Sequence, residues 1–375
     1  MSRGCANPLW PCAMVGAVAA LSACRDIGVV VHGSSACYYY ADAAVPGPVQ
    51  STMLVQDEVI FGAGDRLREV VGDLSDRYER IAVVNTCVPS VMGEDITDAL
   101  DGYDVMVIDA PGFCGNLEVG WRRALDALTL AVDNDRQGVN IDGLCTMWPG
   151  AAGDRMEAES LIRRAGLSVA AVIPGDSLES VRHAAPVSLL ADPDMASGTG
   201  TAAGSLLGLV NLREAFENLG NLCEDADVTP VLAEIQKTEE EIFRACGKYI
   251  RRHDPPRVAL FGTYSQTAMV ADLLKKSLDA EIACIGVRNA PPERCRHPVV
   301  QTTDRDIEKR MILEAEPDLI IGSSFEHALS PETLFVGLTY PLRGRVRLHH
   351  RPLIGTEGAR AVMEEILNVC AGGGL

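Results

Sequence analysis

Short apolar segments alternate with longer helix-like stretches along nearly the whole chain. Continuous apolar runs bounded by turn residues are typical of strands buried on both faces. Such runs occupy residues 27–31, 81–85, 105–109, 139–143, 168–173, 187–190, 257–261, 281–285 and 319–321. Helical spacing of apolar residues marks residues 63–74, 121–134, 155–165, 231–250, 266–278, 304–315 and 358–369. Strands that alternate with helices form right-handed crossovers, so the pattern predicts an α/β fold with parallel sheets.

The 375 residues, 47% of them apolar, suit two or three α/β domains. A long polar helix around residues 236–251 is followed by His-Asp-Pro-Pro at 253–256, which predicts a linker. A new strand then begins at Arg257 and runs into a small-residue turn. We expect domains over residues 1–135, 136–252 and 253–375, the last ending in a helix.

Charge and cysteine usage narrow the class of protein. The formal net charge of −19 argues against a nucleic-acid partner, because phosphate binding needs clustered Lys and Arg. No uninterrupted apolar run reaches the roughly 18 residues that a membrane span needs, so we expect no membrane insertion. Leu-Ser-Ala-Cys at 21–24 imitates a lipoprotein cleavage site, but it leads directly into the strand 27–31, which favours a helix followed by a strand. Many unpaired cysteines and no secretion pattern predict a cytoplasmic protein.

Three cysteines stand where an apolar run gives way to a turn. Cys12 follows Leu-Trp-Pro, Cys37 ends His-Gly-Ser-Ser-Ala-Cys, and Cys87 lies in Asn-Thr-Cys-Val-Pro. This placement predicts three thiols on loops at one end of a parallel sheet, where an iron–sulfur cluster can be held. Three ligands are one short of four, which implies a partner subunit, a non-cysteine ligand or an open iron site.

Most of the other cysteines are interpreted as packing residues. Free cysteines in a reducing compartment are usually small buried apolar side chains. Those inside helix-like or strand-like patterns are Cys24, Cys145, Cys223, Cys246, Cys284 and Cys370. No Cys-x-x-Cys pair occurs, which argues against a zinc ribbon, a thioredoxin-type pair or a ferredoxin-like loop.

The glycine-bearing turns at strand ends, including 111–116, 173–176, 262–265 and 322–324, contain neither a Walker loop nor a Gly-x-Gly-x-x-Gly fingerprint. We therefore expect no binding of ATP or NAD by the usual routes. The polar residues that are weak catalytic candidates are His32, Glu94, Asp95, His349 and His350. A structural role, such as capping a helix or satisfying a turn, is an alternative for each.

Ordered motifs resemble those of the nitrogenase component 1 family. Pro-Cys-Ala-Met-Val-Gly-Ala at 11–17 and His-Gly-Ser-Ser-Ala-Cys at 32–37 are similar to its Cys-x-x-x-Gly-Ala and His-Gly-Pro-x-Gly-Cys segments. Phe-Gly-Ala-Gly at 61–64 is similar to its Phe-Gly-Gly segment, and Thr-Cys-Val-Pro-Ser-Val-Met-Gly-Glu-Asp-Ile at 86–96 to its Cys-Pro-x-x-x-Ile-Gly-Asp-Asp-Ile segment. Weaker similarity continues through 112–116, 139–143, 337–341 and 351–359, so it covers almost the whole chain.

The resemblance implies three stacked Rossmann-like α/β/α domains. It also implies that Cys12, Cys37 and Cys87 ligate a 4Fe-4S cluster, with Gly33 and Gly93 beside it. In the family the cluster lies at a subunit interface, so the expected partner is a second copy of this chain or a related component 1 subunit. A separate iron-protein ATPase is the expected electron donor, which fits the missing nucleotide loop.

Departures from the family pattern indicate which branch this chain resembles. The segment 187–198 has no cysteine and 338–341 has no histidine, the two residue types that hold the nitrogenase metal cofactor. We therefore expect no molybdenum cofactor. The compact length resembles the catalytic subunit of nickel-sirohydrochlorin a,c-diamide reductive cyclase, which implies reduction of a bound tetrapyrrole. A non-catalytic scaffold for cofactor assembly and a cluster-free α/β binding protein remain alternatives.

Overall fold

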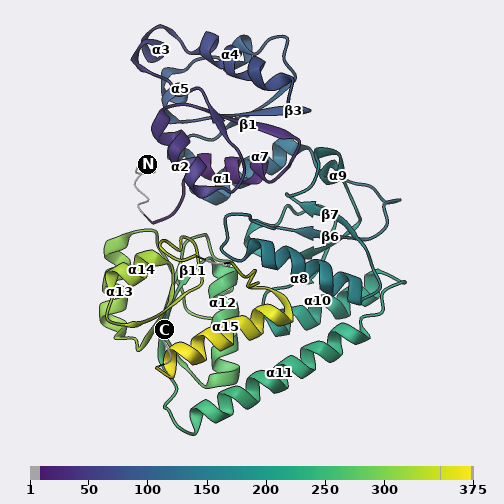
Figure 1. Cartoon of the computed structure of the whole chain (residues 1–375), viewed down its shortest axis with the longest axis vertical. Coiled ribbons are helices and arrows are strands. Elements are labelled where there is room, and N and C mark those ends of the chain that lie inside the picture. The colour runs from purple at the N-terminus through teal and green to yellow at the C-terminus, as the bar shows by residue number, and fades with distance from the viewer. Residues whose placement is uncertain (1–8, 347, 373–375) are drawn as a thin grey trace. The chain divides into compact units, whose positions relative to one another are not determined.

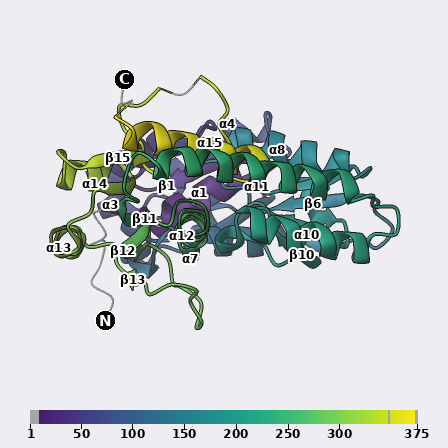
Figure 2. The same ribbon diagram turned by 90° about the horizontal axis from the view of Figure 1, so that it is seen from below.

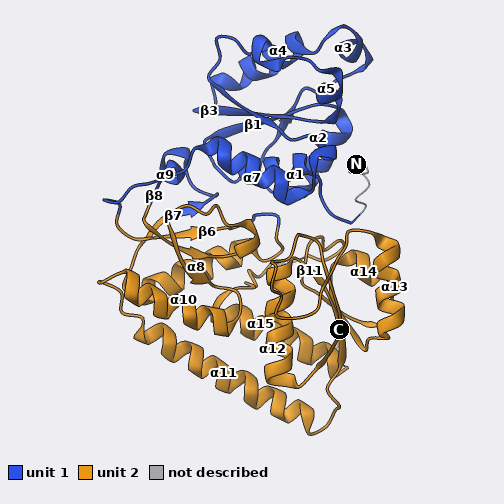
Figure 3. Cartoon of the chain, turned by 180° about the vertical axis from the view of Figure 1, so that it is seen from behind, with its two compact units in different colours: residues 1–136, 145–147, 171–184 blue, residues 137–144, 148–170, 185–375 orange. Residues whose placement is uncertain are grey.

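The computed structural model describes residues 9–346 and 348–372 (Figure 1). Contacts between residues divide the chain into two compact units (Figure 3). Unit 1 comprises residues 1–136, 145–147 and 171–184, and unit 2 comprises 137–144, 148–170 and 185–375. No helix among the described residues is both long and apolar enough to cross a bilayer.

Unit 1 is built on a four-stranded sheet in the order β2-β1-β3-β4, whose strands are all parallel. Its strands are β1 (Ile27–His32), β2 (Gln50–Ser51), β3 (Arg80–Asn85) and β4 (Val105–Asp109). Its helices are α1 (Ala13–Ser22), α2 (Ser35–Ala44), α3 (Gln56–Phe61), α4 (Gly64–Ser75), α5 (Cys87–Met92), α6 (Ile96–Ala99), α7 (Leu117–Leu128) and α9 (Leu178–Arg182). A short pair, β5 (Ala131–Val132) with β8 (His183–Ala184), completes the unit.

Helices cover both faces of this sheet. Figure 1 shows α4 on one side of β1 and β3, and α1 and α7 on the other. On the α4 side, Leu67 and Val71 pack with Val30 and Val83 of the two central strands, and all four side chains are fully buried. Buried apolar side chains on both faces explain why the strands appear in the sequence as continuous apolar runs.

Unit 2 contains α8 (Ala151–Arg164), α10 (Leu209–Leu222), α11 (Thr229–Ile250), α12 (Tyr264–Leu278), α13 (Arg305–Ala315), α14 (Ser324–Leu329) and α15 (Gly355–Cys370). The second sheet of the chain has the order β10-β9-β6-β7, from β6 (Val139–Asp142), β7 (Val169–Ile173), β9 (Val187–Leu190) and β10 (Thr201–Ser205). The third has the order β13-β12-β11-β14-β15, from β11 (Arg257–Gly262), β12 (Glu281–Val287), β13 (Val300–Gln301), β14 (Leu319–Gly322) and β15 (Leu334–Gly337).

The long helix α11 packs against the C-terminal helix α15. One side of α11 is buried, and ion pairs join the two helices. Figure 2 shows the two helices side by side. Arg360 of α15 pairs with Glu234 at 2.6 Å and with Glu241 at 3.0 Å, both on α11. The polar stretch that the sequence suggested as part of a linker is therefore a packed helix, and its apolar stripe of Ile235, Ile242 and their neighbours is buried.

The prediction of an α/β fold with parallel sheets is confirmed. Each predicted strand occurs within two residues of its expected bounds. The predicted helix 121–134 was wrong at both ends: α7 begins at Leu117 and ends at Leu128, because Thr129 adopts a left-handed φ of 54° and the chain then enters β5. The edge strand β10 was missed because Thr-Ala-Ala-Gly-Ser is not an apolar run. The boundaries of three separate domains stay a prediction.

Helices α1 and α7 approach so closely that glycine is required at their contact. A Cβ added at Gly120 would lie 1.6 Å from the carbonyl oxygen of Ala13, and one at Gly16 would lie 1.9 Å from that of Leu117. Real Cβ atoms cannot be so close to backbone oxygen, so any side chain at these positions forces the helices apart. The contact places the start of α1 against the loop that precedes α7.

We expect Gly120→Ala to destabilise the protein by at least about 2 kcal/mol, because overpacked sites without room to relax lose that much. Gly247→Ala is the matched control, since it lies inside α11 with open space where its Cβ would stand. Replacing such a glycine by alanine should stabilise by roughly 0.5 to 1 kcal/mol. Urea denaturation followed by circular dichroism measures both, and similar midpoints for the two variants would contradict the close contact.

Candidate metal centre

The loops that carry Cys37 and Cys87 leave the same edge of the first sheet. β1 ends at His32, and the first turn of the following helix α2 contains Cys37. β3 ends at Asn85, and Cys87 is the first residue of α5. β1 and β3 are neighbouring parallel strands with His32 opposite Asn85. Both cysteines therefore follow the carboxyl edge of the sheet, where α/β proteins bind their ligands.

Thr86 ties these two loops together. Its backbone N–H and its hydroxyl both donate to the carbonyl oxygen of His32, at 3.2 and 2.9 Å. A Cβ at Gly33 would lie 2.0 Å from Oγ1 of Thr86, so the loops leave room only for glycine. Gly93 ends α5 with a left-handed φ of 70°, which glycine adopts without strain. Both glycines thus have structural roles, and their contact with a cofactor stays a prediction.

Cys12 joins this edge from a different element, the N-terminus of α1. Its backbone forms an antiparallel bridge with Asn116, in the loop between β4 and α7. Burial raises the pKa of the Cys12 thiol, and the Cys87 and Cys37 thiols raise that pKa further. The loop that pairs with Cys12 also contacts Cys87, because the backbone N–H of Gly112 in that loop donates to Sγ of Cys87. Cys12 is therefore held beside the loop that touches Cys87.

A fourth cysteine, Cys114, was missed by the sequence analysis, which treated its segment as a glycine-rich turn. It ends the short 3-10 helix Gly112–Cys114 that follows β4, the neighbour of β3. The backbone N–H of Gly112 donates to Sγ of Cys87 at 3.0 Å, so this loop touches the Cys87 loop directly. Burial raises the pKa of Cys114, and Cys87 is among the groups that raise it further. The sequence signal that could have identified Cys114 was its position five residues after the predicted strand 105–109.

The donors at this edge are soft. None of the four cysteines is in a disulfide. Among residues 9–346 and 348–372, no three His, Cys, Asp or Glu side chains gather closely enough to ligate one metal ion. Thiolates are the ligands that hold iron–sulfur clusters in proteins. The binding of a cluster by Cys12, Cys37 and Cys87 stays a prediction.

Exposed apolar side chains lie beside the cysteines in the sequence and on the same loops. Val91 of α5 is 77% exposed and Tyr39 of α2 is 64% exposed. Phe113, next to Cys114, is 39% exposed. Large apolar side chains that gather on one surface mark sites of protein association.

His32 is buried at the same carboxyl edge. Its Nδ1 lies 3.2 Å from Oγ1 of Thr52, whereas its Nε2 has no hydrogen-bond partner in the described part of the chain. Burial lowers the pKa of His32 to about 4. The imidazole is therefore neutral at pH 7, and the structure gives it a packing role without excluding contact with a bound group.

The acidic candidates after Cys87 cap helices. Oε1 of Glu94 accepts the backbone N–H of Ala63 at 2.7 Å, at the start of α4. Asp95 is the N-cap of α6 and accepts the N–H of Thr97 at 3.0 Å. Hydrogen bonds from Thr97 lower the pKa of the exposed Asp95 carboxyl. Both residues thus cap helices, which is the structural alternative stated for them from the sequence. Their catalytic roles stay predictions.

The C-terminal candidates His349 and His350 belong to unit 2, whereas the four cysteines belong to unit 1. Both histidines are exposed and lie in the irregular segment that precedes α15. Nothing in their surroundings marks them as catalytic. Their roles stay predictions.

The two segments that lack the expected cofactor ligands meet through Trp148 of unit 2. In 187–198, Asp192 accepts a hydrogen bond from Nε1 of Trp148 at 2.8 Å. In 338–341, the ring of Tyr340 lies 6.2 Å from the Trp148 ring. Burial, and then the Asp194 carboxylate, raise the pKa of Asp192 well above its ordinary value. These segments present a buried carboxyl group and aromatic rings in place of a thiolate and an imidazole.

The parallel sheets and the thiols at one sheet edge define an α/β protein with a cysteine-lined carboxyl edge. Residues 12–371 match the sequence model of the nitrogenase component 1 type oxidoreductases, and the chain belongs to this family. The solved structure titled "Nitrogenase Cp1 at pH 6.5" superposes with a TM-score of 0.77 at 17% identity, covering 98% of this chain and 93% of that one. This likeness confirms the fold.

Two kinds of curated relative are similar in sequence. The nitrogenase iron-molybdenum cofactor biosynthesis protein NifE of Sinorhizobium fredii is 29% identical over 207 residues, 47% of this chain and 41% of that protein. The nitrogenase molybdenum-iron protein beta chain of Methanococcus maripaludis is 22% identical over an alignment of 442 positions, covering 96% and 93% of the two chains. The match to this NifE protein thus spans less than half of its length.

Acid should destabilise the protein partly through His32. The pKa of about 4 in the folded chain lies below the ordinary value of about 6.5, so the unfolded chain binds more protons between these pH values. The contribution of His32 is complete above pH 6.5 and is lost as the pH falls toward 4, by about 1.4 kcal/mol per unit at most. We expect wild type to lose more stability than His32→Gln between pH 7.5 and 5 in urea denaturation. An unchanged difference between the two proteins would refute the neutral, buried imidazole.

Proposed function

We propose that this chain is a nitrogenase-like reductase subunit that holds a 4Fe-4S cluster through Cys12, Cys37 and Cys87 and reduces a bound tetrapyrrole of the nickel-sirohydrochlorin diamide type. The observation that carries the proposal is the convergence of these thiols at one carboxyl edge, none of them in a disulfide. When bound, such a cluster accepts and releases single electrons at low potential.

The chain's own groups prepare the thiols for this role. The backbone N–H of Gly112 donates to Sγ of Cys87 at 3.0 Å, which holds this sulfur in place beside the loop after β4. Cys12 is held by backbone pairing and buried, so its thiol is costly to ionise without a metal. Iron would supply the positive charge that offsets this cost. The fourth ligand would come from a partner subunit, from a non-cysteine group or from Cys114.

Two partners belong to the proposal. A second component 1 subunit, identical or related, would cover exposed side chains such as Tyr39 and Val91 beside the cysteine loops. A separate iron-protein ATPase would deliver electrons, since the sequence contains no phosphate-binding glycine loop. The acidic chain would attract that protein partly through charge, so their association should weaken as salt rises.

The choice of a tetrapyrrole rests on what the chain lacks. The segments 187–198 and 338–341 carry no cysteine or histidine to hold a nitrogenase-type metal cofactor. An organic macrocycle needs no such ligands from the protein.

A second candidate function is a scaffold on which a metal cofactor is assembled without turnover. The similarity to NifE of Sinorhizobium fredii, whose name describes cofactor biosynthesis, favours it. The same thiols would then bind a cluster precursor. A reductase would chemically change its bound substrate and release the product. A scaffold would bind the cluster precursor without turnover.

Anaerobically purified protein should be brown and contain iron and sulfide. Changing Cys12, Cys37 or Cys87 to Ser should remove most of the iron and the thiolate-to-iron absorbance, because each variant loses a soft ligand. Cys284→Ser and Cys370→Ser are matched controls, since these thiols lie elsewhere in the fold and should leave iron content unchanged. Equal iron in all five variants would refute the ligand assignment. Adding Cys114→Ser shows whether that thiol supplies the fourth ligand.

The chain alone should neither hydrolyse ATP nor oxidise NADH. Reduction of a nickel tetrapyrrole should require dithionite, ATP and a separate iron protein, and it is measured by the loss of the substrate's visible absorption band. Omitting the iron protein is the control. Turnover with NADH and this chain alone would overturn the proposed route of electrons. Tight binding of an iron-rich cofactor precursor without any turnover would decide for the scaffold.

A further inference from the structure

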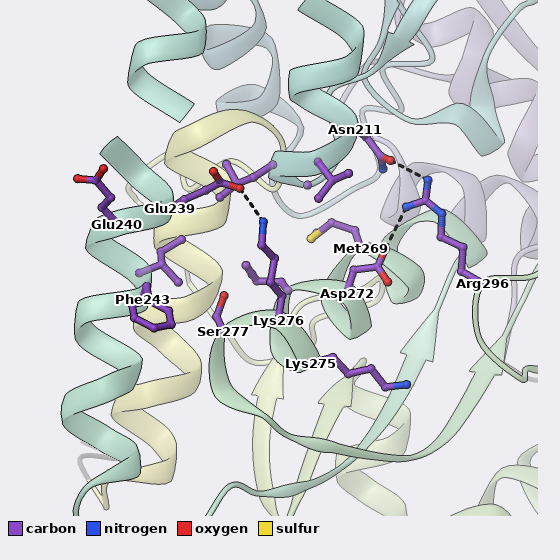
Figure 4. Close-up of a pocket in the computed structure, with 15 residues that line it drawn as sticks. Asn211, Glu239, Glu240, Phe243, Met269, Asp272, Lys275, Lys276, Ser277 and Arg296 are labelled. Atoms are coloured by element: carbon purple, nitrogen blue, oxygen red, sulfur yellow. Dashed lines mark hydrogen bonds and ion pairs between the residues drawn. The ribbon is translucent and has the colours of Figure 1, made fainter. Parts of the chain in front are cut away.

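Unit 2 contains a large cavity that has no part in the proposed function. It has a volume of about 730 Å³ and lies among the start of α10, the middle of α11 and one face of α12 (Figure 4). Its floor is apolar and buried, formed by Leu209, Ile242, Met269 and Leu273. Phe243 forms part of its wall and is 70% exposed. A cavity of this size and lining suits a small organic molecule, because ligand sites usually enclose about 300 to 1,000 Å³.

Two polar bridges bound the cavity, and Figure 4 shows Met269 between them. In one, Lys276 of α12 donates to Glu239 of α11 at 2.8 Å. In the other, Arg296 donates to Asp272 of α12 and to Asn211 of α10, both at 3.0 Å. These bridges connect neighbouring elements across the space. The cavity is therefore a bounded pocket rather than a groove running the length of a helix, which favours a small molecule over a peptide helix.

The pocket lining carries three cations, Lys275, Lys276 and Arg296, and three carboxylates, Glu239, Glu240 and Asp272, in a chain whose net charge is −19. Arg213, which does not line the pocket, adds a fourth cation beside Glu239. Glu239 binds Arg213 at 2.9 Å as well as Lys276, so it remains paired if Lys276 moves to another anion. Burial raises the pKa of Glu239, but the hydrogen bond and charge of Lys276 and the charge of Arg213 lower it more, so the carboxylate stays ionised.

The second carboxylate is shared in the same way. Asp272 contacts Arg296 at 3.0 Å and Nε2 of His297 at 2.7 Å. Lys275 contacts no carboxylate among the described residues: its Nζ lies 3.5 Å from Nδ1 of His297. Glu240 is the third acidic group of the lining, and it accepts a hydrogen bond from Gln236. With Arg213 included, these four cations exceed the three carboxylates by one charge, and this excess favours an added anion.

We propose that this pocket binds an organic acid with an apolar ring or chain. The apolar part lies on Met269 and against the exposed face of Phe243, and its burial supplies most of the affinity. The acidic group pairs with Lys276, while Arg213 keeps Glu239 neutralised and Lys275 adds uncompensated positive charge. The site is independent of the cysteines, so it holds whether the chain is a reductase or a scaffold.

The test uses the purified full-length protein and two fluorescent probes. Anilinonaphthalene sulfonate carries an apolar ring system with one anionic group, and N-phenyl-1-naphthylamine is its uncharged counterpart. We expect saturable binding of the sulfonate with one strong site. Phe243→Ser should weaken both probes by about tenfold, because it removes an aromatic wall. Lys276→Gln should weaken the sulfonate by about fivefold or more and leave the uncharged probe within about twofold.

Matched controls exclude binding to other exposed groups. Phe61→Ser removes a phenylalanine of α3 that is 85% exposed, and Lys309→Gln removes an exposed lysine of α13; neither should change the strong site. The NMR signal of the Met269 methyl group, assigned with Met269→Leu, should shift as the sulfonate is added. Equal affinity in Phe243→Ser and Phe61→Ser, or a Met269 signal that does not move, would overturn the proposal. Loss of iron in the cysteine variants tests the metal centre separately.

Discussion

The parallel register of β1, β3 and β4 is the constraint on which the candidate metal centre depends. His32, Asn85 and Asp109 lie level across these strands, so the three following loops begin at one edge. Each loop then places a cysteine within five residues of its strand: Cys37, Cys87 and Cys114. Parallel strands gather distant parts of a sequence at a single edge without any direct pairing between the loops themselves. The thiols converge because the strands are aligned.

The position of Cys12, the remaining thiol at this edge, is set by helix packing and not by strand register. Cys12 precedes α1, and α1 lies against α7 through Gly16 and Gly120, where backbone atoms of the two helices touch. Backbone pairing with Asn116 then fixes Cys12 beside the loop after β4. A side chain at either glycine would force the helices apart and displace Cys12. Helix packing therefore fixes the position of Cys12 in this unit.

The third sheet shows that the same architecture can close its carboxyl edge. Arg288 directly follows β12 and forms ion pairs with Glu308 of α13 and Glu326 of α14, and all three side chains are almost fully buried. Ser323, directly after β14, donates its hydroxyl to Glu326 at 2.7 Å. A buried arginine paired with two carboxylates occupies this edge with the protein's own groups, and breaking such a set leaves an unpaired buried charge. The first sheet has cysteine thiols at the equivalent place.

The sequence by itself determined the strands and the positions of two of the candidate ligands relative to them. Strands such as 27–31 and 81–85 were predictable because residues buried on both faces must be apolar at every position, which is a local pattern. The positions of Cys37 and Cys87 after the sheet edge were predictable because each lies within five residues of the end of such a strand. The sequence could not show the edge strand β10, whose residues are small and half exposed, or the end of α7, where Thr129 turns left-handed.

Only the tertiary structure decided which groups meet. No local pattern places Cys12 against Asn116, since their pairing depends on two helices packing through glycine. The structure likewise assigned Glu94 and Asp95 to helix caps and brought Cys114 to the thiol edge. It also created the cavity lined by Met269 and Phe243, where the successive helices α10, α11 and α12 pack around one space. Sequence patterns record burial and backbone conformation, whereas contacts between distant residues arise only once the elements have packed.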